Sequence, residues 1–85
     1  MDDIYAVFKY PKTGYPHDRE LVTACGFKIG ERYLVDTISV GQSSTSVWLA
    51  GYVRCFNSVH FDFENEDGES VDVYSIPEFN PYLNF

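Results

Sequence analysis

Basic side chains are absent from the last third of this sequence. The chain of 85 residues carries 13 acidic and 6 basic residues, which gives a formal net charge of −7. Acids and bases are equal in number up to Arg54, so residues 55–85 hold seven acids and no base. Since proteins bind nucleic-acid phosphates through lysine and arginine, this distribution argues against direct binding of nucleic acid.

Long hydrophobic runs and a basic amino terminus are also missing. No run approaches the roughly 18 apolar residues that a membrane-spanning helix requires. The opening Met1-Asp2-Asp3 lacks the basic start of a signal peptide. We therefore expect no membrane association and a location in the cytoplasm of the cell that makes the protein.

Cysteine and histidine are scarce, with two residues of each. Cys25 and Cys55 lie 30 residues apart without a C-x-x-C motif, which favours two reduced, buried thiols over a disulfide. Neither thiol has the close spacing to His17 or His60 that structural zinc sites show. The sequence therefore predicts no zinc site.

Catalytic and calcium sites are equally poorly supported. Cys55 and His60 are five residues apart, which places thiol and imidazole on opposite faces of a regular strand. His17 is expected to help begin a helix. A calcium loop starting at Asp62 would have glycine in the seventh position and Val73 in the twelfth, which departs from the EF-hand pattern. We expect no enzymatic activity, no cofactor and no bound metal.

Aromatic and apolar residues, by contrast, are abundant. Aromatic residues make up 18 % of the chain and apolar residues 45 %, which is typical of a packed globule and not of a disordered chain. A second hydrophobic core would need roughly 100 further residues. The sequence therefore predicts a single domain over residues 1–85.

Stretches rich in β-branched and aromatic residues indicate strands. They predict strands over residues 4–10, 32–40, 45–53, 59–64 and 70–76. A change of phase at Asp36-Thr37 indicates a bulge or a sharp bend. The most regular alternation predicts that Val59, Phe61 and Phe63 face the core and that His60 faces solvent.

One short helix interrupts this pattern. Asp18 can cap a helix over Arg19–Cys25, and Gly26 supplies its end. A helix of two turns is unstable alone, so it must pack on the sheet. Together, these elements predict a mainly β fold: a small antiparallel barrel or a curled sheet of about five strands with one short helix.

Three motifs resemble those of SH3-like β-barrels. They are Gly30-x-x-Tyr33-x-Val35, Thr45-x-Val47-x-Leu49 and Phe56-Asn57-Ser58-Val59-x-Phe61. The resemblance implies a short 3₁₀ step at 56–58 before the last strand of the barrel. It does not imply binding of proline-rich peptides, because the Ala-Leu-Tyr motif and a second tryptophan beside Trp48 are absent.

Two further motifs resemble short accessory proteins encoded by bacteriophages and mobile elements. They are Tyr-Pro-x-x-Gly-Tyr-Pro at 10–16 and Pro-x-Phe-Asn-Pro-Tyr-Leu at 77–83. The resemblance implies a protein that works in the cytoplasm of a bacterial host. It includes the possibility of an inhibitor of a host defence enzyme, of the anti-CRISPR or anti-restriction type.

The acidic residues near the carboxyl end form the main candidate site. They fall on the predicted hairpin over 62–72: Asp62, Glu64, Glu66, Asp67, Glu69 and Asp72. One interpretation is a solvated hairpin whose charge protects a sheet edge. The other is a two-stranded acidic ribbon that mimics nucleic acid and occupies the basic groove of a host protein, such as a CRISPR effector or nuclease.

The aromatic tail is a second candidate surface. Phe79, Tyr82, Leu83 and Phe85 either seal the open end of the sheet or anchor a partner or a second copy of the chain. A rival hypothesis is a small-molecule binder with Tyr15, Trp48 and Tyr82 around a pocket, and another is a structural accessory subunit of a phage.

Overall fold

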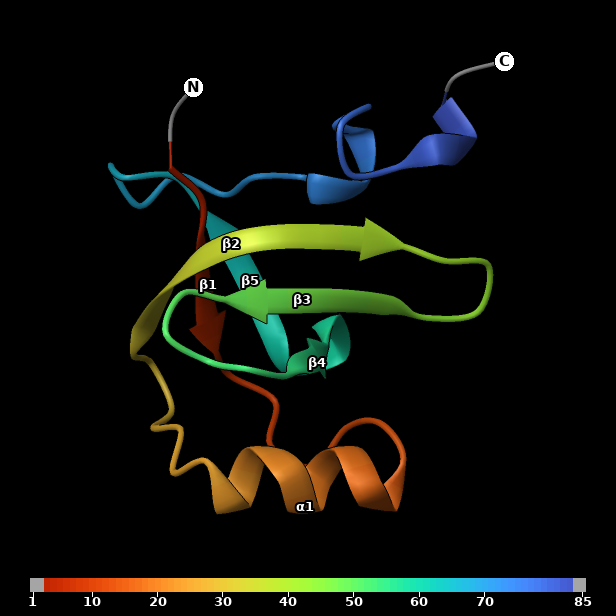
Figure 1. Ribbon diagram of the computed structural model, residues 1–85. Helices are drawn as coiled ribbons and strands as arrows, with labels where there is room; N and C mark the ends of the chain where they lie inside the picture. The colour runs from red at the N-terminus through yellow and green to blue at the C-terminus, as the bar shows by residue number, and fades with distance from the viewer. Residues whose placement is uncertain (1–2, 84–85) are drawn as a thin grey trace.

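A curled antiparallel sheet forms most of the computed structural model, which describes residues 3–83 (Figure 1). Its order is β4-β3-β2-β1-β5, with the bounds β1 (Tyr5–Phe8), β2 (Arg32–Val40), β3 (Thr45–Leu49), β4 (Cys55–Asn57) and β5 (Phe61–Glu64). The described strands leave the sheet open, with β4 and β5 at its edges. The predicted mainly β fold, with a curled sheet of about five strands and one helix, is confirmed.

The long strand β2 bends the sheet. Its first part pairs with β1, and Val35 to Val40 pair with β3. The register shifts between Val35 and Thr37, which places a bulge at Asp36, where the change of phase predicted it. A bulge increases the local twist of a strand. As a result, β1 and β5 run across the direction of β3 (Figure 1).

The helix α1 (Pro16–Ala24) lies in the connection between β1 and β2 and begins three residues earlier than predicted. Tyr15 is its N-cap residue. Pro16 fits the first turn because the N–H groups there have no acceptor within the helix, so the missing N–H of proline costs no hydrogen bond. Asp18 lies inside the first turn, where its carboxylate accepts a hydrogen bond from the Tyr15 N–H at 3.3 Å. Val22 is buried, so α1 packs on the sheet as expected.

A 3₁₀ turn, η1 (Ser58–His60), joins β4 directly to β5. The sequence predicted this step two residues too early. The turn breaks the expected alternation: Val59 is exposed, and His60 is completely buried instead of facing solvent. The His60 Nδ1 atom lies 2.8 Å from the Tyr10 carbonyl oxygen. Because a carbonyl can only accept, Nδ1 carries the proton and donates.

The predicted return strand over 70–76 is wrong. A single bridge pairs Glu64 with Ser70, and the chain then turns into a second 3₁₀ turn, η2 (Val73–Ser75). The side chain of Asp72 accepts a hydrogen bond from the backbone of this turn. Such a local bond competes with strand pairing. The C-terminal segment lies on the side of the sheet opposite α1 (Figure 1).

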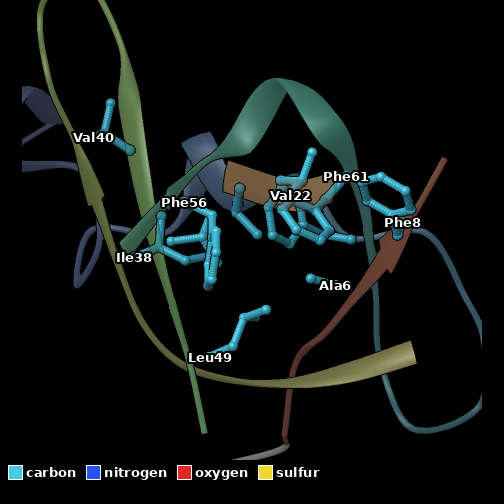
Figure 2. Packing of buried hydrophobic residues seen from close by; sticks show 11 residues of the cluster. Ala6, Phe8, Val22, Ile38, Val40, Leu49, Phe56 and Phe61 are labelled. Atoms are coloured by element: carbon cyan, nitrogen blue, oxygen red, sulfur yellow. The ribbon is translucent and has the colours of Figure 1, made fainter. Parts of the chain in front are cut away.

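Every strand and α1 contribute side chains to the core (Figure 2). The buried members labelled there are Ala6, Phe8, Val22, Ile38, Val40, Leu49, Phe56 and Phe61. The core is therefore made by the whole sheet together with one face of a short helix, as a chain of this size requires.

Phe27, in the connection between α1 and β2, is the centre of the aromatic packing. Its ring lies 4.8 to 5.8 Å, between centroids, from the rings of Phe8, Tyr33, Tyr52, Phe56 and Phe61. Three of these five pairs, those with Tyr33, Phe56 and Phe61, are edge-to-face, an arrangement that adds to the stabilisation from apolar burial. This connection therefore stabilises the fold although it belongs to no strand or helix.

Candidate functional site

The turn that follows β5, Asn65–Glu69, carries three exposed carboxylates, and we call it the acidic turn. Asn65 organises it: its Oδ1 atom accepts hydrogen bonds from the N–H groups of Asp67 and Glu69, both at 3.0 Å. Gly68 takes a φ of 82°, a conformation that favours glycine. Glu66, Asp67 and Glu69 are thus displayed on a backbone with defined geometry. Asparagine ahead of Asp-Gly is the sequence signal for such a turn.

The two acids of β5 are in a different situation, because each forms an ion pair with a basic residue that is far away in the sequence. Lys9 Nζ lies 3.4 Å from the Asp62 carboxylate, and the Tyr10 hydroxyl donates to the same carboxylate at 3.0 Å. This hydrogen bond raises the pKa of Tyr10. Arg32 forms an ion pair with Glu64. Asp62 and Glu64 are therefore partly occupied by contacts within the fold.

Arg32 also fixes the acidic turn to the sheet. Its guanidinium lies 4.2 Å from the centroid of the Tyr5 ring, a cation–π contact. Its Nη2 atom donates to the carbonyl oxygens of Asn65, at 2.8 Å, and of Glu66, at 3.4 Å. One arginine thus joins β2, β5 and the turn. No local sequence pattern points to Arg32, because its hydrogen-bond partners are more than 30 residues away.

Asp72, the last of the six candidate acids, stabilises the 3₁₀ turn η2. Its carboxylate accepts hydrogen bonds from the Tyr74 N–H at 3.1 Å and from the Ser75 hydroxyl at 2.7 Å. Since residues 70–76 form no strand, the predicted two-stranded acidic ribbon is not formed. Among the residues that the structure describes, no basic side chain lies within ion-pair distance of the three carboxylates of the acidic turn.

The residues of the aromatic tail also differ in their burial. Phe79 is half-buried against the core, and its carbonyl oxygen accepts a hydrogen bond from the Val40 N–H at 3.0 Å. Tyr82 and Leu83 are exposed on a last 3₁₀ turn, η3 (Pro81–Leu83). Phe85 lies outside the described residues. Phe79 therefore seals part of the core, while anchoring of a partner by the tail stays a prediction.

The aromatic residues of the small-molecule hypothesis do not surround a common pocket. Tyr15 is 65 % exposed and lines two surface grooves without Trp48 or Tyr82. Trp48 is half-buried on β3, and Tyr82 lies in the tail. The geometry thus gives this hypothesis no additional support.

The two cysteines are free, but the prediction that both are buried is wrong. Cys25 is half-buried at the end of α1, whereas Cys55 is exposed on the edge strand β4. Within residues 3–83, no three histidine, cysteine, aspartate or glutamate side chains are grouped so that they could hold a metal ion. The same stretch contains no helix that is long and apolar enough to cross a membrane.

The fold and these surfaces define a small, mainly β protein with a displayed acidic turn. Residues 3–85 match the family described as bacteriophage T4 protein Y07B. Because this match spans almost the whole chain, the protein belongs to that phage family. Comparisons with curated proteins and with solved structures gave no match. The resemblance to phage-encoded proteins is thereby confirmed.

Proposed function

We propose that this phage protein inhibits a nucleic-acid enzyme of its bacterial host by binding it, without catalysis. In this proposal the acidic turn enters a basic groove of the host protein that otherwise holds DNA or RNA. A CRISPR effector or a restriction nuclease has such a groove. The protein would act in the cytoplasm of the host, where these enzymes work.

The observation that supports this proposal best is the geometry of the acidic turn. Glu66, Asp67 and Glu69 are exposed and have no basic neighbour within the described part of the fold. Asn65 and Arg32 order the backbone that carries them. Pre-ordered charges lose little entropy on binding, and a strongly acidic surface speeds association with a basic one.

We also infer that the fold is related to SH3-like barrels. Three features support this: the strand order β4-β3-β2-β1-β5, the bent β2 that serves both parts of the sheet, and the 3₁₀ turn between β4 and β5. This relation concerns the architecture alone. The proposed partner rests on the acidic turn.

The proposal is tested by capture of host proteins on two charge-matched variants. The first replaces the acidic turn: Glu66→Gln, Asp67→Asn and Glu69→Gln. The control replaces exposed acids elsewhere: Glu20→Gln, Asp36→Asn and Glu78→Gln. Both lower the negative charge equally, and exposed substitutions of this kind change stability by only about 0.5 kcal/mol.

We expect the wild type and the control to capture the same nucleic-acid enzyme and to inhibit it. The acidic-turn variant should bind it about tenfold more weakly. Because the contact is ionic, the affinity of the wild type should also fall steeply as salt is raised. Equal binding by the two variants would contradict the proposal, and so would capture of a protein that does not act on nucleic acid.

A further inference from the structure

A neutral groove lies beside η1, formed by parts of the chain that are far apart in the sequence. It has a volume of about 550 Å³. Its walls come from the loop before α1, the turn between β2 and β3, η1, and η2, and no charged side chain lines it. Three large side chains there are exposed: Tyr15 by 65 %, Val59 by 44 % and Tyr74 by 46 %. Exposed apolar groups gathered at one groove are typical of a contact surface.

Hydrogen bonds between elements hold the walls of this neutral groove. Thr13 Oγ1 donates to the Val59 carbonyl at 3.0 Å, which ties the loop to η1. The hydroxyls of Ser58 and Tyr74 are 3.1 Å apart, which ties η1 to η2. At Gly14 a Cβ atom would come within 3.2 Å of Val59, so glycine permits this close approach. The groove is thus formed before any partner binds.

A second, acidic groove of about 430 Å³ shares one lining residue, Tyr74, with the neutral groove. Its charged lining consists of Asp62, Glu64 and Asp72 together with a single base, Lys9. Tyr74 therefore lies between an uncharged surface that displays exposed apolar side chains and a surface lined by three acids and one base.

We propose that the two grooves together bind one extended segment of a protein partner. An apolar side chain of that segment packs against Tyr15, Val59 and Tyr74, and a neighbouring lysine or arginine enters the acidic groove. The inference rests on the proposed function in one respect, that the partner is a protein with a basic surface. It adds a second contact, beside the acidic turn, in which apolar burial provides affinity that salt does not weaken.

Charge complementarity favours a basic protein segment over two other possible occupants of the grooves, a nucleic-acid strand and a second copy of the chain. A nucleic-acid strand would bring phosphates close to the carboxylates of the acidic groove, which is unfavourable. A second copy of the chain would bring another net charge of −7 to the same surface. A basic segment complements the acidic groove, whose lining has two more acids than bases. An apolar side chain of that segment can pack on the exposed Tyr15, Val59 and Tyr74 of the neutral groove.

The test is selection from a random dodecapeptide display library on the immobilised full chain. Peptides that combine lysine or arginine with a nearby apolar residue should be enriched. Their affinity should fall about tenfold for Tyr74→Ser and for Val59→Ser. It should fall much less for Tyr74→Phe, which keeps the ring and loses only the hydrogen bond to Ser58. Tyr82→Ser serves as the control, because Tyr82 is similarly exposed but lines neither groove.

Enriched peptides without a basic residue, or a selection without enrichment, would overturn the inference. Equal affinity for Tyr74→Ser, Val59→Ser and the wild type would overturn it as well. These results are distinct from a failure of the proposed function, because Glu66, Asp67 and Glu69 line neither groove. That failure would show as unchanged host-protein binding by the acidic-turn variant.

Discussion

The sheet-and-helix body, residues 5–64, and the C-terminal segment, residues 65–83, are held in place by different forces. In the body, all five strands and α1 contribute buried apolar side chains. In the segment, Val73 is the one described side chain that is buried, and Phe79 is half-buried. Apolar burial therefore stabilises the body, while the segment needs another source of order.

Hydrogen bonds that involve three short polar side chains provide that order. Asn65 organises the acidic turn, Asp72 caps η2, and Asn80 joins the last two turns. The Asn80 amide donates to the Tyr74 carbonyl at 2.9 Å, and its Oδ1 accepts from the Tyr82 N–H at 3.0 Å. At exposed positions such as these, each bond contributes roughly 0.5 kcal/mol. The segment can thus vary its surface charge with little effect on the body.

The largest effect is expected in the body, from Phe27→Ala. The substitution removes the ring at the centre of the aromatic packing and should lower the free energy of unfolding by about 3 kcal/mol. Ile29→Ala is the control, since Ile29 is 68 % exposed and should change it by less than about 0.5 kcal/mol. Urea denaturation of both variants measures this difference. Similar losses would show that Phe27 is not central to the core.

In the segment, Asp72→Ala should have a smaller effect. It removes the acceptor of two hydrogen bonds in η2 and should cost about 1 kcal/mol in the same denaturation experiment. Asp72→Asn retains an acceptor oxygen and should recover most of this loss. If both variants lose the same free energy, the negative charge, and not the cap, is what Asp72 contributes.

Asn65→Ala separates the geometry of the acidic turn from its charge. The net charge stays at −7, but the turn loses the acceptor for two backbone N–H groups. The free energy of unfolding should fall by less than about 1 kcal/mol, and the affinity for the captured host protein by several-fold. Calorimetric titration measures the affinity. Unchanged affinity would mean that charge alone suffices.

The smallest effect concerns alkaline pH. Burial is the main cause that raises the pKa of Tyr33, and its hydrogen bond to Glu31 adds to it. A pKa raised by folding means that the stabilisation is complete below pH about 10 and is lost as pH rises through the higher folded value. Tyr33→Phe should therefore flatten the fall in stability above pH about 10. An unchanged slope in pH-dependent denaturation would exclude Tyr33 as its source.

The predictable parts of the fold were those set by local pattern. The β-branched and aromatic residues at 4–10 predicted a strand where β1 forms, and the change of phase at Asp36 predicted the bulge. Alternation failed at His60, because a 3₁₀ turn shifts the side-chain directions that a strand would have. It failed again after Ser70, where the Asp72 side chain favours a turn over pairing.

For the candidate site, the sequence located the charge but not its partners. The acidic turn lies where the sequence pattern predicted a turn. The ion pairs of Asp62 with Lys9 and of Glu64 with Arg32 depend on which strands become neighbours, and that is a property of the tertiary fold. The six candidate acids therefore divide into three that are engaged with other parts of the fold, Asp62, Glu64 and Asp72, and the three of the acidic turn, which have no basic partner within the described residues.

Competition with nucleic acid tests the central claim most directly. The captured host enzyme is held on the immobilised wild-type protein, and double-stranded DNA or RNA is added at constant ionic strength. We predict that the nucleic-acid substrate releases the enzyme from the immobilised protein, and that a substrate with higher affinity releases more of it. The reason is that the substrate and the phage protein would occupy the same basic groove. A stable ternary complex at saturating nucleic acid would contradict the account.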